Sequence, residues 1–171
     1  MQIILIGYRC TGKSSVGRQL AEKLDLTFYD TDQMITAHIG KSIRELVAEK
    51  GWAAFRREEK NIIDKIAFWG PAVIALGGGA ILDPENRATI RASGTVIWLS
   101  AGLETILKRM SSDSLNADNR PSLTDKSWHE EVRETLEQRI SIYRDLALMQ
   151  VDTEGKSIEE ISSEIVSKMN P

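Results

Sequence analysis

The sequence predicts an α/β protein, a three-layer sandwich in which helices cover both faces of a five-stranded parallel sheet. Two observations support this fold class. Short apolar segments alternate with amphipathic helical segments along the chain, which is typical of a parallel sheet buried between helices. The length of 171 residues and the apolar content of 42% suit one well-buried domain better than two. We therefore expect residues 1–171 to form a single domain.

Five apolar segments are predicted to be the strands. They are IILI at residues 3–6, TFYD at 27–30, AVIAL at 72–76, TVIWL at 95–99 and LMQVD at 148–152. Longer amphipathic segments separate them, and parallel strands need connections of this length to cross over the sheet. We expect these connections to form the two helical layers.

Start signals mark several of the helices. Ser42 and Ser157 each precede a glutamate by three residues, the spacing of a capping box, and Asp83 is followed by a proline suited to the first helical position. Helices are predicted at residues 13–24, 42–50 and 55–68, and from residues 84 and 157 onward. Residues 110–125 lose the apolar periodicity to serine, asparagine and aspartate, which indicates a mobile surface loop.

The composition argues against several classes of partner and location. A net charge of −3 provides no general basic field, so we expect no nucleic-acid partner and no binding to anionic membranes. The apolar run at residues 3–6 is too short for a signal peptide or a membrane span. Cys10 is the single cysteine and cannot form an intrachain disulfide, which suits a reducing compartment. We expect a cytoplasmic protein.

A phosphate-binding motif follows the first predicted strand. The segment GYRCTGKS, residues 7–14, has the spacing Gly-x-x-x-x-Gly-Lys-Ser and leads into a predicted helix. In such a P-loop the backbone N–H groups and the helix N-terminus point at phosphate oxygens, while the lysine reaches the outer phosphates and the serine hydroxyl binds Mg²⁺. The alternative is a glycine-containing turn with a solvated lysine. The residues expected to bind the nucleotide phosphates here are Cys10, Thr11, Gly12, Lys13, Ser14 and Ser15, and the family resemblance described below implies that the nucleotide is ATP.

Two aspartates end the second predicted strand, where ligands of open α/β sheets bind. Asp30 is a candidate to hold Mg²⁺ through water together with Ser14, and Asp32 is a candidate to accept a proton from a substrate hydroxyl. Alternatively, Thr31 or Asp32 is only the N-cap of the following helix. The string Asn-Lys-x-Asp, which specifies guanine in GTPase switches, does not occur.

The ordered set of motifs resembles that of the shikimate kinases. The set consists of GYRCTGKSS, Asp30-Thr31-Asp32, Phe55-Arg56, Gly77-Gly78-Gly79, Arg120-Pro121 and Arg139. The resemblance implies a P-loop fold of the nucleoside monophosphate kinase type, with a substrate-binding segment at about residues 31–60 and a mobile lid at about residues 110–124. It also implies the reaction: transfer of the γ-phosphate of MgATP to the 3-hydroxyl of shikimate, a step of chorismate and aromatic amino-acid biosynthesis.

The resemblance also assigns roles to individual residues. Arg56 and Arg139 would bind the shikimate carboxylate, a task that suits the planar guanidinium fork. Arg56 alone reads as part of a solvated helix face, paired with Glu59 three residues on. Glycine at 78 and 79 would let the backbone approach a substrate hydroxyl.

The remaining implied roles concern the nucleotide and the transferred group. Lys13 and Arg120 would stabilise phosphoryl charge, with Arg120 supplied by the lid, and Asp32 would be the base. Arg109 would stack on adenine, lined also by residues 151–157. Two alternatives stay open: another small-molecule kinase, such as a gluconate kinase, or an inactive kinase-derived metabolite sensor. A monomer is expected.

Overall fold

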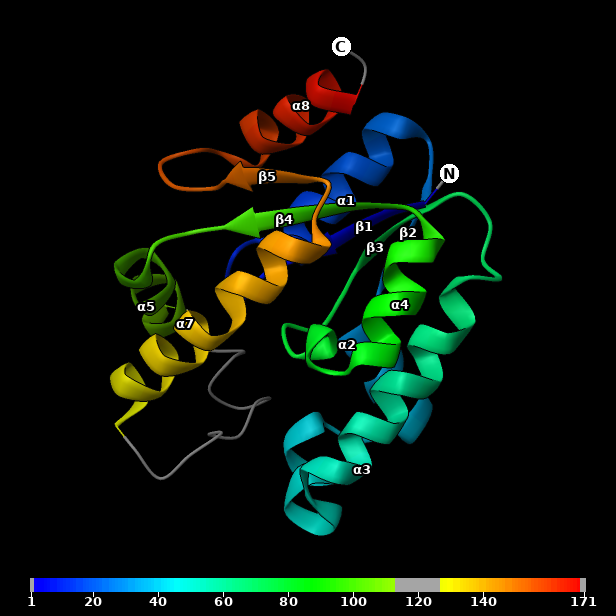
Figure 1. Cartoon of the computed structure of the whole chain (residues 1–171), viewed down its shortest axis with the longest axis vertical. Helices are drawn as coiled ribbons and strands as arrows, with labels where there is room; N and C mark the ends of the chain where they lie inside the picture. Colours follow the sequence, from blue (N-terminus) through cyan, green and yellow to red (C-terminus); the bar gives the residue numbers. More distant parts are fainter. Residues whose placement is uncertain (1, 113–126, 170–171) are drawn as a thin grey trace.

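A computed structural model describes residues 2–112 and 127–169 and confirms the predicted fold class. Five parallel strands form one sheet in the order β2-β3-β1-β4-β5 (Figure 1). The strands are β1 at Gln2–Ile6, β2 at Thr27–Asp30, β3 at Ala72–Ala75, β4 at Thr95–Ser100 and β5 at Met149–Asp152. Each lies within about two residues of its predicted position, and β1 occupies the centre of the sheet.

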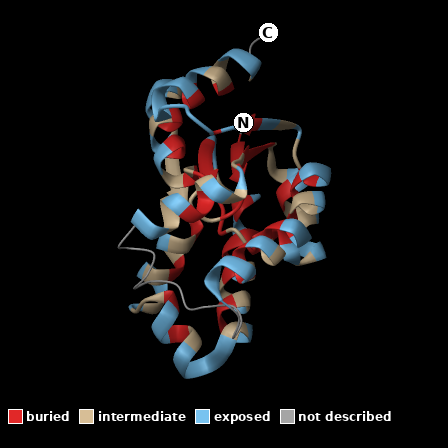
Figure 2. Cartoon of the chain, turned by 90° about the vertical axis from the view of Figure 1, so that its left-hand side faces the viewer, coloured by how far each residue is buried: buried red, intermediate tan, exposed pale blue. Residues whose placement is uncertain are grey.

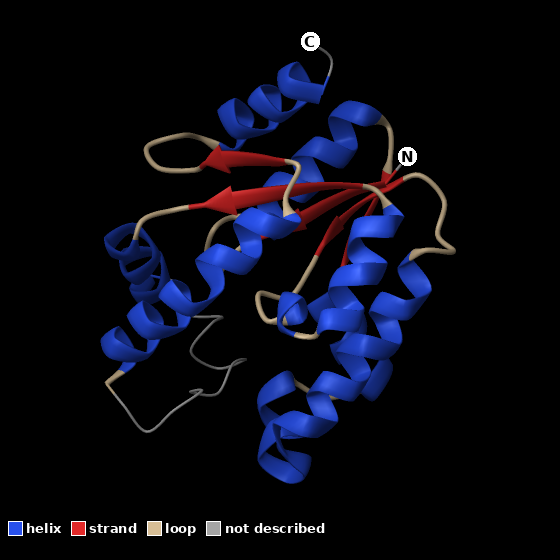
Figure 3. Ribbon diagram, viewed as in Figure 1, coloured by secondary structure: helices blue, strands red, loops and turns tan. Residues whose placement is uncertain are grey.

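Helices connect the strands and cover both faces of the sheet (Figure 3). They are α1 at Lys13–Leu24, α2 at Thr31–Ile39, α3 at Ile43–Ile66, α4 at Pro84–Ser93, α5 at Leu103–Ser112, α7 at Trp128–Leu146 and α8 at Ile158–Met169, with a short 3₁₀ turn, η1, at Ala80–Leu82. The predicted helices at 42–50 and 55–68 correspond to the two halves of α3, which Gly51 separates with a non-helical conformation (φ 75°, ψ 170°). Residues 110–112, predicted to begin the surface loop, are instead the end of α5, and the rest of the predicted loop and lid lies within residues 113–126, outside the described residues.

The start signals predicted from the sequence have the expected geometry. Ser42 accepts a hydrogen bond from the Glu45 backbone, and the Glu45 side chain accepts one from the Ser42 backbone, which completes a capping box. Asp83 caps α4 through the backbone N–H groups of residues 85 and 86. These local bonds fix where α3 and α4 begin.

Alternate side chains of the strands fill two separate cores. Ile3 and Leu5 of β1 face α1 and α8, whereas Ile4 and Ile6 face α3, α4 and α7, and all four are almost completely buried. Figure 2 shows the buried strands between the outer helices. Burial on both faces explains why the strand sequences are almost continuously apolar.

A third, smaller apolar cluster joins α2 to α3 away from the sheet. Its buried members are Ile35, Ile43, Leu46, Ala54, Phe55 and Ile62. We call it the α2–α3 cluster. It packs α2 and α3 against each other. No helix among the described residues combines the length and apolar character needed to cross a membrane.

Candidate active site

The carboxyl ends of three neighbouring strands bring the predicted motifs to one edge of the sheet. In the parallel register Ala75 of β3 lies beside Leu5 of β1 and Asp30 of β2, so the segments that follow these strands emerge together. The Gly77 N–H donates to Thr31 Oγ1 at 3.0 Å and ties two of these segments to each other. This edge is where open α/β sheets bind their ligands.

The GYRCTGKS segment forms a tight cradle between β1 and α1. Gly7 (φ 145°) and Gly12 (φ 90°) adopt backbone angles that favour glycine, and Cys10 is left-handed (φ 60°). The Lys13 ammonium is buried and donates to the carbonyl oxygens of Gly7 at 2.9 Å and Tyr8 at 2.8 Å. The alternative of a solvated lysine in an ordinary turn is therefore wrong.

A pocket opens in front of this loop, and we call it the phosphate pocket. Its lining includes Cys10, Gly12, Lys13, Ser14 and Ser15, five of the six P-loop residues predicted to bind ATP, together with Asp30, Asp32 and Arg9. Thr11 is the exception, because its side chain is buried and donates to the Tyr8 carbonyl at 2.8 Å. The cradle and the cation fit an oligophosphate.

Asp30, not Thr31 or Asp32, is the N-cap of α2. Its Oδ1 accepts from the backbone N–H groups of Asp32 at 3.1 Å and Gln33 at 3.2 Å, which corrects the alternative reading of this motif. Its Oδ2 accepts from Ser14 Oγ at 2.5 Å. A hydroxyl and a carboxylate in contact at the mouth of the phosphate pocket are the hard oxygen donors that Mg²⁺ prefers, so this pair fits the ion.

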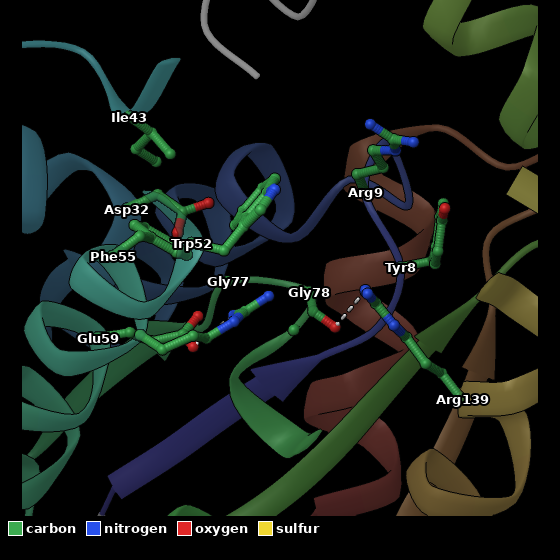
Figure 4. A pocket seen from close by; sticks show the side chains of 12 residues that line it. Tyr8, Arg9, Asp32, Ile43, Trp52, Phe55, Glu59, Gly77, Gly78 and Arg139 are labelled. Carbon is green, nitrogen blue, oxygen red and sulfur yellow. Dashed lines mark hydrogen bonds and ion pairs between the residues drawn. The ribbon is translucent and has the colours of Figure 1, made fainter. Parts of the chain in front are cut away.

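A second pocket lies between α3 and the loop after β3. We call it the acceptor pocket; it is lined by Tyr8, Arg9, Asp32, Ile43, Trp52, Phe55, Arg56, Glu59, Gly77, Gly78, Gly79 and Arg139. In Figure 4 Asp32 and Glu59 lie on one side of it, and Arg9, Tyr8 and Arg139 lie on the other. Every substrate residue predicted from the sequence lines this pocket.

Arg56 pairs with Glu59 inside the acceptor pocket, not on a solvated helix face. Nη1 of Arg56 donates to Glu59 Oε2 at 2.5 Å, and the Glu59 side chain is 1% exposed. The guanidinium also lies 5.2 Å from the centre of the Phe55 ring and fills the space where a side chain on Gly79 would stand. Burial raises the pKa of Glu59 to about 7, against the opposing effect of Arg56. Glycine at position 79 therefore makes room for Arg56.

The raised pKa of Glu59 predicts a pH dependence of stability. The folded state holds this proton up to about pH 7, whereas the unfolded chain releases it near pH 4.5, so the free energy of unfolding falls as the pH rises between these values. The contribution is about 3 kcal/mol. Glu59→Gln is expected to remove it, as measured by urea unfolding at pH 5 and pH 8. The neighbouring Glu58→Gln is the control; a Glu59→Gln protein that keeps the wild-type difference would contradict this assignment.

Two α7 side chains hold the loop after β3 through one carbonyl. Arg139 Nη1 at 3.1 Å and the Tyr143 hydroxyl at 2.6 Å both donate to the Gly78 oxygen. Tyr143 is completely buried, and burial raises the pKa of its hydroxyl far above the usual range, which keeps it a donor. Arg139 thus lies in the acceptor pocket as predicted, and its hydrogen bond to the Gly78 carbonyl orients it there.

Arg109 links the P-loop to the segment after β5. It donates to the Cys10 carbonyl at 3.3 Å and to Thr153 Oγ1 at 3.0 Å and its carbonyl at 2.9 Å. This places Arg109 beside residues 151–157, the segment predicted to line the adenine, and beside the P-loop, the segment predicted to bind the phosphates. Arg120 is outside the described residues.

Several pocket residues were missed in the sequence. Trp52, Ile43 and Tyr8 line the acceptor pocket but carried no signal beyond their apolar character. Arg9 occupies a variable position of the P-loop motif, and only its place between two glycines at a sheet edge hinted at a role. Glu59 was considered only as a surface partner of Arg56.

Comparison with known proteins identifies the family. A family model described as shikimate kinase matches residues 9–170. A shikimate kinase of Syntrophus aciditrophicus is 41% identical over 97% of this chain and 89% of its own, and one of Persephonella marina is 40% identical over 98% of both. The solved shikimate kinase from Acinetobacter baumannii in complex with shikimate superimposes with a TM-score of 0.91 at 29% identity, covering 98% of this chain and 92% of that one.

A gluconokinase from Sinorhizobium meliloti, at a TM-score of 0.60 and 18% identity, shares the fold alone. The sequence matches over nearly the whole chain and the ordered motifs both indicate the shikimate kinases. The chain belongs to the shikimate kinase family of ATP-dependent phosphotransferases.

Proposed function

We propose that this chain transfers the γ-phosphate of ATP to the 3-hydroxyl of shikimate. The observation that carries the proposal is that the two pockets meet at Asp32, which lines both of them. The acceptor pocket also contains Arg56 and Arg139. An acceptor held by its carboxylate in the second pocket would present a hydroxyl to the first. Positioning of this kind supplies much of the rate enhancement in phosphoryl transfer.

Arg56 and Arg139 would bind the shikimate carboxylate. Both guanidinium groups line the acceptor pocket, and each is already oriented, Arg56 by Glu59 and Arg139 by the Gly78 carbonyl. A pre-oriented planar fork loses little freedom when it binds a carboxylate bidentately. The Gly78 and Gly79 backbone would face the ring hydroxyls, with Trp52 and Phe55 forming the apolar wall.

Asp32 would accept the proton of the 3-hydroxyl as the oxygen attacks phosphorus. The P-loop N–H groups and Lys13 would hold the phosphates, with Lys13 exchanging its bonds to the Gly7 and Tyr8 carbonyls for phosphate oxygens. Ser14 and Asp30 would hold Mg²⁺, which when bound neutralises phosphate charge. Arg109 would contact the adenine, and Arg120 would stabilise the transferred group from the lid.

The organisation of the protein is part of the proposal. Residues 1–171 would act as one cytoplasmic, monomeric domain, with a substrate-binding segment at about 31–60 and a lid at about 110–124 that closes over the phosphates. Its product would serve chorismate and aromatic amino-acid biosynthesis.

A coupled assay of ADP release with shikimate, quinate and gluconate in turn tests the substrate. We expect ADP release to depend on shikimate and on Mg²⁺. It should be weak with gluconate, because an open chain has no rigid ring to pack against Trp52 and Phe55. ADP production that does not respond to shikimate would overturn the proposal. Turnover with shikimate would also exclude an inactive sensor.

A further inference from the structure

Two side chains line both the phosphate pocket and the acceptor pocket, Asp32 and Arg9. Figure 4 shows them on opposite sides of the acceptor pocket. A group that passes from the first pocket to the second therefore passes between a carboxylate and a guanidinium. Asp32 has a proposed role in this passage, whereas Arg9 has none.

We propose that Arg9 is a further catalytic residue whose guanidinium binds the phosphoryl group in transit, and that Glu131 is the positioning residue that holds it. The inference rests on the proposed phosphoryl transfer and adds a P-loop arginine to its machinery. In this step the bond from phosphorus to the β-phosphate oxygen breaks, and a bond to the acceptor hydroxyl oxygen forms. The hydroxyl proton passes to Asp32, and ADP leaves with the electron pair.

The contacts of Arg9 fix its guanidinium before any ligand binds. Nη2 donates to Glu131 Oε1 at 2.9 Å, and the two side chains are only 15% and 2% exposed. The guanidinium also lies 5.6 Å from the centre of the Tyr8 ring. Glu131 belongs to the first turn of α7, so its position does not depend on the P-loop itself. A guanidinium held in this way needs no reorganisation when charge develops beside it.

The unused donors of Arg9 point to a ligand. A guanidinium has five N–H groups, and the hydrogen bond to Glu131 uses one of them. Within the described residues, the Arg9 Nε is buried and has no hydrogen-bond partner. Buried donors without partners are costly and rare in native proteins, so their presence at a pocket indicates a group that binds there.

The chemistry of the transferred group matches these donors. During transfer the negative charge spreads over three equatorial oxygens, which a planar, permanently charged fork can bind through two parallel hydrogen bonds. Lys13 supplies a point charge at the base of the loop, and its ammonium bonds to two carbonyls there. Arg9 supplies the cation on the acceptor side.

Arg9→Met tests the proposal in the full-length protein. We expect kcat to fall about 100-fold, typical for loss of one donor to a transition-state oxyanion, while the KM for shikimate stays within about threefold. Because Arg9→Met also leaves Glu131 buried beside an apolar side chain, the paired variant Arg9→Met/Glu131→Gln is measured as well; it should fold and show the same loss. Arg133→Met, an exposed arginine of α7, is the matched control and should keep the wild-type kcat.

Two further measurements distinguish a catalytic role of Arg9 from a purely structural one. Guanidinium ion should restore part of the kcat of Arg9→Ala and none of that of Asp32→Asn. Arg9→Met should also slow the ATP hydrolysis that occurs without an acceptor, because water then receives the same phosphoryl group. A wild-type kcat in the Arg9 variants would overturn the proposal. A loss of kcat that guanidinium does not reverse, with unchanged ATP hydrolysis in the absence of acceptor, would also overturn it. A wild type that does not phosphorylate shikimate, but whose ATP hydrolysis depends on Arg9, would overturn the proposed function alone.

Discussion

Asp32→Asn is expected to lower kcat by about 10³-fold, equivalent to about 4 kcal/mol in activation free energy, with little change in the KM for shikimate. Asparagine keeps the size and the hydrogen-bonding acceptor of the side chain but cannot take the proton of the attacking hydroxyl. Among the described residues Asp32 is the one carboxylate that lines both pockets, because Asp30 lines the phosphate pocket alone and Glu59 the acceptor pocket alone. Steady-state kinetics with saturating ATP and shikimate would measure the change.

Binding measurements make this result specific. Trp52 lines the acceptor pocket, so tryptophan fluorescence should report shikimate binding equally in the wild type and in Asp32→Asn. Asp64→Asn, an exposed aspartate of α3, is the matched control and should retain full activity. A kcat of Asp32→Asn within about threefold of the wild type would refute the role of Asp32 as the base, since general-base catalysis contributes far more.

Gly7→Ala is expected to destabilise the protein by at least about 3 kcal/mol and to lower its melting temperature by roughly 6–12 °C. The reason is steric: at φ 145° a Cβ on residue 7 would lie 2.3 Å from the backbone oxygen of Leu99. Leu99 belongs to β4, which is paired with a strand on each side, so its backbone oxygen cannot move aside as a flexible side chain can. Thermal unfolding followed by circular dichroism would measure the shift.

A second glycine separates the two causes of this effect. Gly40 also has a positive φ, 68°, but a Cβ there would meet no atom within 4 Å. Gly40→Ala therefore carries only the cost of a left-handed residue, about 1–2 kcal/mol. Equal melting temperatures for Gly7→Ala and Gly40→Ala would show that the contact with Leu99 is relieved easily, contrary to this account.

Much of the fold could be predicted because its determinants are local. The strands are continuous apolar runs, and the starts of α3 and α4 are fixed by side chains within three residues of the cap. The break within α3 could also be predicted, because the apolar pattern stops after residue 50 and Gly51 takes a non-helical conformation there. The single cap at Asp30 was instead ambiguous, since three adjacent residues of that motif can all cap a helix.

The candidate site was predictable in its parts but not in its connections. The P-loop is recognisable because its mechanism requires glycines, lysine and serine at fixed spacing in one short segment. The pairs that organise the pocket have no such spacing: Arg9 and Glu131 are 122 residues apart, and Gly78 and Tyr143 are 65 apart. Only the parallel sheet and the return of α7 bring these partners together. For the same reason Glu59 could be recognised as a neighbour of Arg56 but not as a buried carboxyl.

The α2–α3 cluster has its own buried side chains, distinct from the two cores that hold the sheet. A cluster of this kind can lose its packing while the sheet stays intact. We therefore expect α2 and the first half of α3 to form a cooperative unit of lower stability than the strands. Amide hydrogens of α2 and of the first half of α3 would then exchange with solvent through partial opening, whereas those of β1 would require global unfolding. A ligand that joins Arg56 to the Gly78 loop would tie this unit to the sheet and slow its exchange. Binding in the acceptor pocket would thus be detected as slower amide hydrogen exchange in the α2–α3 cluster.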